Sequence, residues 1–362
     1  MSLPTYYNYS PVFPNPFVCL KELVGYGATE LHARLPWNGL GVWLEETWHS
    51  MSVCVHMDWY IILLPLLFFA GITGARFVLN KVLIRKIPIW CKLDKEGTAK
   101  FPDSVWKMLL YTVTFVWATY LVFFGEDQLF FDLKSHFSKW YLGGAPVASA
   151  GVYWLYMFEL GWYYHQAYAA IYMDAFRKDT TLIMVHHFIT IALLFFSFII
   201  RFHNIGLFIL FLQDIGDVTI ELSKTVVYFK TRGGGHCRKT EIVANICFAL
   251  FTLQHIVFRL YWFPTKAIYS TMVVGMITHP GGPFYLPFNT GLWILYGMQV
   301  YWFKFIIHLL FKLVILRQEI QDARELDEDE EFDCDESKEE DVVPPPEKSK
   351  EPTNTRYRKI KK

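Results

Sequence analysis

The sequence lacks the motifs by which several classes of soluble enzyme are recognised. Its six cysteines are scattered without a Cys-x-x-Cys pair, so we expect neither a disulfide framework nor a zinc site. It has no serine nucleophile elbow, no P-loop and no dinucleotide-binding glycine motif. The 34 basic and 34 acidic residues balance at pH 7, and we expect no nucleic-acid partner. We expect no cleavable signal peptide, because the first 50 residues are mixed and polar.

Apolar and aromatic residues are abundant instead. Hydrophobic residues make up 53% of the chain and aromatic residues 18%, a share typical of membrane proteins with interfacial belts of Trp and Tyr. We therefore predict an all-α polytopic membrane protein with seven transmembrane helices, since seven apolar runs are near the length that spans a bilayer. The runs are 59–79, 106–124, 147–171, 180–200, 205–223, 242–262 and 288–313.

Loop charge orients these spans. If the N-terminus is luminal, the three cytosolic loops carry 13 basic residues and the three luminal loops carry four, which fits the positive-inside rule. The sequon at Asn8 is then luminal, and we expect it to be glycosylated. The chain divides into a luminal segment at 1–58, a first anchor at 59–79 and a cytosolic tail at 317–362.

The tail is rich in like charges and poor in apolar residues, which predicts disorder. It is acidic first and basic at its end. Ser337 lies among acids, with Glu340 three residues later, and is a candidate site for an acidophilic kinase. A tail that is simply solvated is the alternative.

Two neighbouring runs carry ionisable residues that lipid anchoring does not explain. The polar hinge 201–204 joins them, so they should form an antiparallel hairpin that brings histidines and acids to a similar depth. The acids follow a spacing of i, i+3 and i+7, which places them on one helix face. Ionisable groups at membrane depth are costly and usually functional. The residues are His186 and His187 in the first run and Asp214, Asp217 and Glu221 in the second.

Several roles are open to this cluster. A neutral imidazole near carboxylates is a suitable general base, and one histidine could instead be the nucleophile. We expect Asp214 and Asp217 to orient the imidazoles, and Thr190 to stand on the same side as the histidines. Glu221 either contacts substrate or is solvated near the interface. Adjacent histidines point about 100° apart, so we predict no metal site; structural hydrogen bonding between helices is the alternative.

Charged residues also stand at the cytosolic mouth of the hairpin, at Arg177, Lys178 and Asp179. They either reflect positive-inside topology or bind an anionic substrate head such as a nucleotide phosphate.

At these residues the sequence resembles the ceramide synthases, membrane enzymes with a TLC domain. The matching stretches are Y-M-D-A-F-R-K-D from Tyr172, M-V-H-H-F-I-T, and F-L-Q-D-I-G-D-V-T-I-E-L-S-K. The outer motifs and a short first membrane loop resemble most the branch of ceramide synthase 1, which has no homeobox-like insert. Gln213 departs from many animal members, which have histidine there, and could alter rate or pocket polarity.

The resemblance implies a TLC domain over 100–316, in which helices two to seven form a barrel around an acyl cavity. It implies an acyl-CoA-dependent N-acyltransferase of the endoplasmic reticulum membrane that joins a fatty acyl group to sphinganine or sphingosine. The implied partners are acyl-CoA, the sphingoid base, membrane lipids and a second subunit in a homo- or heterodimer; acyl-CoA is a co-substrate, and no cofactor is expected. A non-catalytic, lipid-binding or lipid-regulating TLC protein is the alternative.

Overall fold

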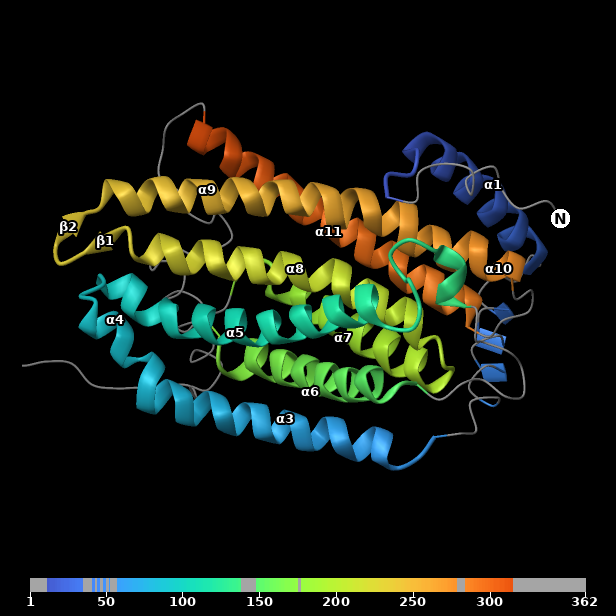
Figure 1. Cartoon of the computed structure of the whole chain (residues 1–362), viewed down its shortest axis with the longest axis horizontal. Coiled ribbons are helices and arrows are strands. Elements are labelled where there is room, and N and C mark those ends of the chain that lie inside the picture. Colours follow the sequence, from blue (N-terminus) through green and yellow to red (C-terminus); the bar gives the residue numbers. More distant parts are fainter. Residues whose placement is uncertain are drawn as a thin grey trace, which may run out of the picture.

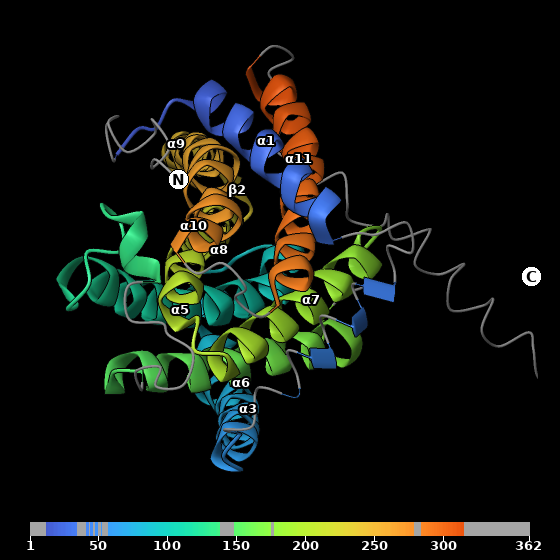
Figure 2. The same cartoon turned by 90° about the vertical axis from the view of Figure 1, so that its right-hand side faces the viewer.

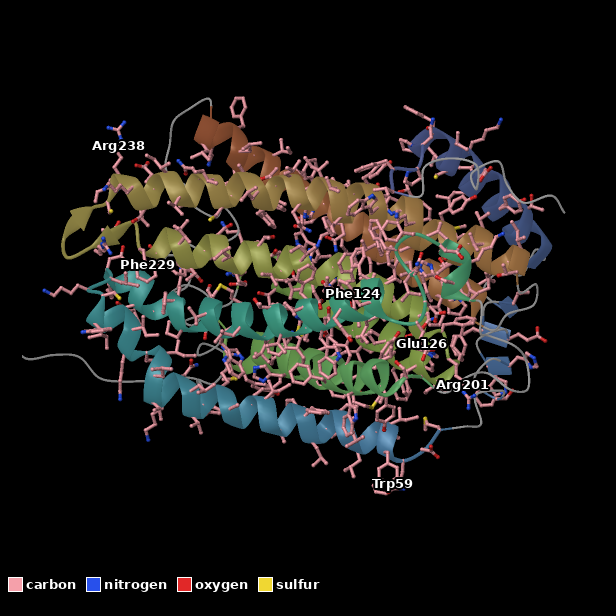
Figure 3. The ribbon with its side chains drawn as sticks, in the orientation of Figure 1. Trp59, Phe124, Glu126, Arg201, Phe229 and Arg238 are labelled. Carbon is pink, nitrogen blue, oxygen red and sulfur yellow. The ribbon has the colours of Figure 1, made fainter. Side chains whose placement is uncertain are left out.

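The computed structural model describes residues 12–34, 41–42, 44–45, 48–49, 52, 57–137, 148–174, 177–278 and 284–314. Its long helices run side by side along one axis of the molecule (Figure 1). Arg201, Glu126 and Trp59 lie toward one end of this axis, and Phe229 and Arg238 lie at the other (Figure 3). We call these the Arg201 end and the Arg238 end.

The described elements are helical apart from one short hairpin. The main helices and strands are α1 (Pro16–Arg34), α3 (Tyr60–Leu79), α4 (Lys86–Trp90), α5 (Lys95–Phe124), α6 (Ala150–Tyr172), α7 (Thr180–Ile199), α8 (His203–Tyr228), β1 (Thr231–Arg232), β2 (Gly235–His236), α9 (Arg238–Gln254), α10 (Gly275–Thr278) and α11 (Tyr285–Val314). π-Helical segments at Asn80–Ile84, His255–Ile268 and Ser270–Val274 continue α3 and α9, and a 3₁₀ turn covers Leu133–His136.

The prediction of an all-α fold with several helices able to span a membrane is confirmed for the described residues. Five helices of the described chain are long and apolar enough to cross a membrane: Tyr60–Trp90, Lys95–Phe124, Thr180–Ile199, Arg238–Thr278 and Tyr285–Leu313. The remaining two, α6 and α8, have 23 and 26 residues but are less apolar. Both helices bury polar side chains inside the protein, which lowers their hydropathy without exposing charge to lipid.

Two helices extend beyond the apolar runs from which they were predicted. α5 begins at Lys95 rather than near 106, because the Asp94 side chain caps it by accepting a hydrogen bond from the Gly97 N–H at 2.7 Å. The helix that starts at Arg238 continues through Pro264 to Thr278. π-Helical geometry accommodates that proline, so part of the loop expected at 263–287 is helical instead.

The hairpin predicted around 201–204 is present between α7 and α8. Arg201 turns the chain in the left-handed conformation, with a φ of 63°. The Tyr156 hydroxyl of α6 then donates a 3.0 Å hydrogen bond to the carbonyl of His203, which fixes the start of α8. The turn between α7 and α8 is thus tied to α6 by a hydrogen bond.

The first anchor, α3, lies at the periphery beside α6 and away from α9 and α11 (Figure 2). A Cβ at Gly161 of α6 would lie 2.5 Å from the Cβ of Phe68, so the two helices approach closely only because this residue is glycine. Arg76 of α3 is buried and makes ion pairs with Asp103 at 2.8 Å and Asp174 at 2.9 Å. Packing and charge together attach the anchor to the bundle.

We expect Asp174→Asn to destabilise this attachment. Burial alone would raise the pKa of Asp174. The charges of Lys107, whose Nζ lies 2.5 Å from Asp174 Oδ2, and of Arg76 instead hold this pKa well below its usual value. The ion pairs therefore stabilise the fold throughout the neutral range and are lost only as pH falls through that lowered pKa. The free energy of unfolding should fall by about 2 kcal/mol, less than for fully buried pairs.

Thermal denaturation of the purified variant measures this effect. The matched control is Glu96→Gln, which breaks an exposed ion pair with Lys100 on α5 and should cost no more than about 0.5 kcal/mol. Equal melting temperatures for the two variants would contradict the prediction.

Candidate active site

A cavity lies between α7, α8, the helix Arg238–Thr278 and α11, with about 1050 Å³ of space free of protein atoms, part of which is open to solvent. Most of its lining is apolar, from Leu193 and Leu194 on α7 to Leu292 and Leu295 on α11. Aromatic rings line it toward the Arg201 end. Its polar lining includes a hydrogen-bonded group on α8, the Arg238–Thr278 helix and α11, which we call the polar wall and which is formed by Gln213, Asp217, Arg259 and Gln299. His186 and Thr190 of α7 line the same cavity.

The two histidines face different surroundings. Their ring centroids are 5.7 Å apart, and the rings are tilted by 58°. His186 lines the cavity and lies edge-on to Trp302, with centroids 5.5 Å apart. His187 is buried outside the lining and lies 6.1 Å from the ring of Tyr163. The divergence expected of neighbouring helical residues is present, and His186 is the one that can touch a ligand in the cavity.

The three acids of α8 do not act as one group. Asp214 is fully buried, and its Oδ2 accepts a 2.9 Å hydrogen bond from Thr114 of α5. Asp217 lines the cavity, and Glu221 is paired with Lys224 at 2.8 Å. A step of three residues leaves about 60° between two side chains on a helix, which is enough to point Asp217 into the cavity and Asp214 into the bundle.

None of the hydrogen bonds between described residues joins a carboxylate to either imidazole. The Nδ1 atoms of His186 and His187 are buried without a partner in the described part of the chain, as is the Thr190 hydroxyl. Orientation of the imidazoles by Asp214 and Asp217 is therefore not a feature of this structure. Buried polar atoms without a hydrogen-bond partner are rare in proteins, and their gathering around this cavity is a feature of the site.

Arg259 was not among the predicted site residues, yet it is at the centre of the polar wall. Its Nη2 donates to Asp217 Oδ1 at 2.9 Å and to the backbone carbonyl of Gln213 at 2.7 Å, and its Nη1 donates to Gln299 Oε1 at 3.2 Å. Gln299 also donates to Gln213 Oε1 at 3.2 Å. An arginine inside an apolar run was the available signal, because such a residue is costly in a membrane unless it is paired or functional.

A glycine makes room for this arginine. A Cβ at Gly216 would lie 2.5 Å from Arg259 Nε and 2.7 Å from Cζ. The absence of a side chain lets the guanidinium lie against α8, where it reaches both Asp217 and Gln213. Gly216, one of the two residues between Asp214 and Asp217, is thus part of the geometry of the site.

The predicted mouth residues lie at the Arg238 end, before α7. The Arg177 N–H donates to the Thr180 hydroxyl at 2.7 Å, and Asp179 is buried at the start of α7. Arg177, Lys178 and Asp179 are not among the residues that line the cavity. Their predicted contact with an anionic head group remains a prediction.

Comparison with known proteins places this geometry in a family. The model of the TLC domain matches residues 100–308. The chain belongs to the TLC-domain family.

Its relatives in the TLC-domain family include ceramide synthases of animals and plants. Ceramide synthase 1 of Homo sapiens is 36% identical over 261 residues, which cover 71% of this chain and 73% of the human protein. Ceramide synthase 1 of Mus musculus is 35% identical over 267 residues, 74% of this chain and 76% of the relative. Ceramide synthase LOH2 of Arabidopsis thaliana is 28% identical over 278 residues, 72% and 89% respectively. The resemblance to ceramide synthases and to the ceramide synthase 1 branch is confirmed.

Two predicted modification sites fall outside the TLC domain and outside the described residues. Asn8 precedes the first described residue, and Ser337 follows the last. Both remain predictions.

Proposed function

We propose that this protein is a ceramide synthase, which joins the acyl group of a fatty acyl-CoA to the amine of sphinganine or sphingosine. The observation that carries the proposal is that His186 and the Arg259–Asp217 pair line the same, mostly apolar cavity. From His186 to the end of α7 at Ile199 is about 20 Å along the helix. This depth suits a long acyl chain whose carbonyl stops at the polar wall.

His186 is the proposed catalytic residue of this reaction. As general base it takes a proton from the attacking amine while the thiolate of CoA leaves the acyl carbon. As nucleophile it accepts the acyl group on an imidazole nitrogen with loss of CoA, and the amine then displaces the imidazole to form the amide. Both routes need the imidazole to touch the carbonyl carbon or the amine, and of the two histidines only His186 lines the cavity.

Arg259 is proposed to stabilise the oxyanion that forms when the carbonyl is attacked. Its guanidinium is held by Asp217, Gln213 and Gln299, so it needs no rearrangement to face developing negative charge. Asp214, which is bonded to Thr114, is proposed to act through the packing of α8 rather than on the substrate. Thr190 and Gln213 are proposed to contact the polar part of a substrate in the cavity.

The assay that tests the proposed activity uses purified protein in phospholipid nanodiscs with a fatty acyl-CoA and sphinganine, and detects dihydroceramide by mass spectrometry. The proposal expects product that depends on both substrates. Substrate binding without product would instead favour the non-catalytic, lipid-binding alternative.

We also propose that the protein spans the endoplasmic reticulum membrane seven times, with α6 and α8 as the two further spans. The Arg201 end is luminal in this arrangement and the Arg238 end cytosolic. The basic loops support this orientation, since Arg232, Arg238 and Lys239 gather near the hairpin of β1 and β2. A homo- or heterodimer stays a prediction.

Glycosylation at Asn8 provides a test of this orientation. In cells, treatment with a glycosidase should increase the gel mobility of the protein, and Asn8→Gln should run at the deglycosylated position before treatment. The conservative variant Ser10→Thr keeps the sequon and should remain glycosylated. A wild-type protein whose mobility does not respond to the enzyme would contradict the prediction.

A further inference from the structure

Helix α1 has an inner face that packs on the membrane-spanning helix Arg238–Thr278. Cys19 and Leu23 are buried, with exposed fractions of 1% and 4%. Just before the helix, the carbonyl of Val12 accepts a 2.9 Å hydrogen bond from the indole of Trp262. A Cβ at Gly27 would lie 2.7 Å from the Cε of Met272, so the end of the methionine side chain packs against α1 at this point.

The outer face of α1 is apolar too. Phe17, Leu20 and Val24 are 81%, 54% and 62% exposed, and Phe13, just before the helix, is 61% exposed. Within the helix, a spacing of three and four residues gathers Phe17, Leu20 and Val24 in one stripe, about 110° around the helix axis from Cys19 and Leu23, and Phe13 leads into it. A helix at a water-facing surface normally shows charged and polar residues on that side. In α1 this stripe has Lys21 as its one neighbouring charge among the side chains that are described.

The contacts of α1 set its depth in the membrane. Along the Arg238–Thr278 helix, the exposed large apolar side chains lie between Ile242 and Ile256. A hydrocarbon core of about 30 Å takes about 20 helical residues, so the core that begins near Ile242 ends near Trp262. The segment that leads into α1 is bonded to that region, since Tyr261 donates to the carbonyl of Pro14 and Trp262 donates to the carbonyl of Val12. The start of α1 therefore lies at the level where the hydrocarbon core meets the head groups.

The direction of α1 agrees with this depth. Figure 2, which views the molecule from the Arg201 end, shows α1 beside the helix that ends in α10 and crossing obliquely in front of α11. In Figure 1 it lies at that same end and is inclined to the long helices. The exposed aromatic rings of Trp59 and Tyr60 begin α3 toward the same end, as expected of a membrane interface.

We propose that α1 is an interfacial helix whose outer stripe, Phe13, Phe17, Leu20 and Val24, inserts among the lipid acyl chains of the leaflet at the Arg201 end. The occupant is lipid because the stripe continues the apolar surface of the spanning helix that α1 covers, at the depth of the interface. Lys21 can extend its amine from the edge of the stripe toward lipid phosphates. The helix anchors the chain in addition to its spanning segments, and this inference does not depend on the proposed reaction.

The position of α1 connects the membrane to the cavity. Gly27 packs against Met272, and the neighbouring Thr271 lines the cavity. The Tyr285 hydroxyl of α11, also a lining residue, donates to the carbonyl of Met272 at 3.2 Å. An anchored α1 would thus support the cavity wall where the two helices meet.

Spin-label accessibility tests the proposal on the full chain in phosphatidylcholine nanodiscs. Single cysteines at positions 17, 20, 24, 25 and 29 are labelled in a background that lacks the six native cysteines. Power saturation then compares collisions with oxygen, which concentrates in lipid, and with a water-soluble nickel chelate. The references are Val113→Cys, on the exposed apolar surface of α5, and His236→Cys, on the hairpin.

The ratio of oxygen to nickel accessibility should approach the Val113 value at positions 17, 20 and 24 and be several-fold lower at positions 25 and 29. This alternation reports the orientation of the helix and does not require activity. Ratios near the His236 value at 17, 20 and 24 would place the stripe in water and overturn the proposal. Low accessibility to both reagents there, with spin–spin broadening, would show a second copy on the stripe and would also overturn it.

Discussion

His186→Ala is expected to lower the rate of ceramide formation by about 100-fold to 10,000-fold, the range that a positioned acid–base group contributes. The cavity, its apolar lining and Arg259 should survive the change, because His186 makes no hydrogen bond through Nδ1 among the described residues and contacts Trp302 edge-on. The loss should therefore appear in kcat with acyl-CoA binding largely retained. Initial rates at saturating acyl-CoA and sphinganine measure it.

Two further substitutions make this result specific. His187→Ala removes a histidine that lies outside the cavity lining, and we expect a smaller loss of activity from it. His236→Ala removes an exposed histidine of β2, paired with Glu241 at 3.0 Å, and should leave the rate unchanged. Equal losses of activity for His186→Ala and His187→Ala, at equal protein levels, would contradict the proposal that His186 alone of the two acts on the substrate.

Gly216→Ala should lower activity by about 10-fold to 100-fold with little loss of stability. The added methyl group would meet the guanidinium of Arg259, which can move because it ends a flexible side chain. Movement would break its hydrogen bonds to Asp217 and Gln213, and a displacement of about 1 Å at a catalytic group can cost 100-fold in rate. The melting temperature and kcat of the same preparation separate the two effects.

Gly297→Ala is the matched control for this substitution. Gly297 lies within α11, and a Cβ there meets no atom within 4 Å. Both substitutions gain helix propensity by up to about 1 kcal/mol, so that gain cancels in the comparison. Full activity in Gly216→Ala, or an equal loss in Gly297→Ala, would refute the role given to the close approach of α8 and Arg259.

The sequence predicted the hairpin of α7 and α8 because both of its signals are local. Apolar runs of sufficient length predict the two helices, and the polar residues between them predict the turn. Depth along a helix follows from residue number at a fixed rise, so the histidine pair and the acids could be assigned to a similar depth, with His187 level with Asp217. The structure brings His186 and Asp217 to the same cavity.

Rotation about the helix axis was harder to predict. A shared face was inferred for Asp214, Asp217 and Glu221 from their spacing, but about 60° between the first two is enough to separate the cavity from the α5 interface. Asp214 faces α5 because Thr114 lies there to donate to it, and Asp217 faces the cavity, where Arg259 donates to it. Those positions are set by tertiary packing.

The partners of Arg259 could not be found by local reading either. Gln299 lies 40 residues away along the chain, and its bond to Arg259 exists because α11 packs against the helix that carries the arginine. The inner and outer faces of α1 were missed for a different reason. The segment 1–58 was classed by its mixed composition, which conceals that its apolar residues fall on two sides of one helix.

The most direct test of the central claim uses a fatty acyl-CoA that carries a diazirine at the end of its chain. After irradiation of purified protein in nanodiscs, mass spectrometry of the peptides locates the chain terminus. Labelling should fall on aromatic residues of the cavity near the Arg201 end, such as Phe202, Phe284 and Phe288, and excess palmitoyl-CoA should suppress it. Labelling confined to exposed residues such as Phe188 and Val113, and unaffected by the competitor, would contradict a cavity that holds the acyl chain with His186 at its carbonyl.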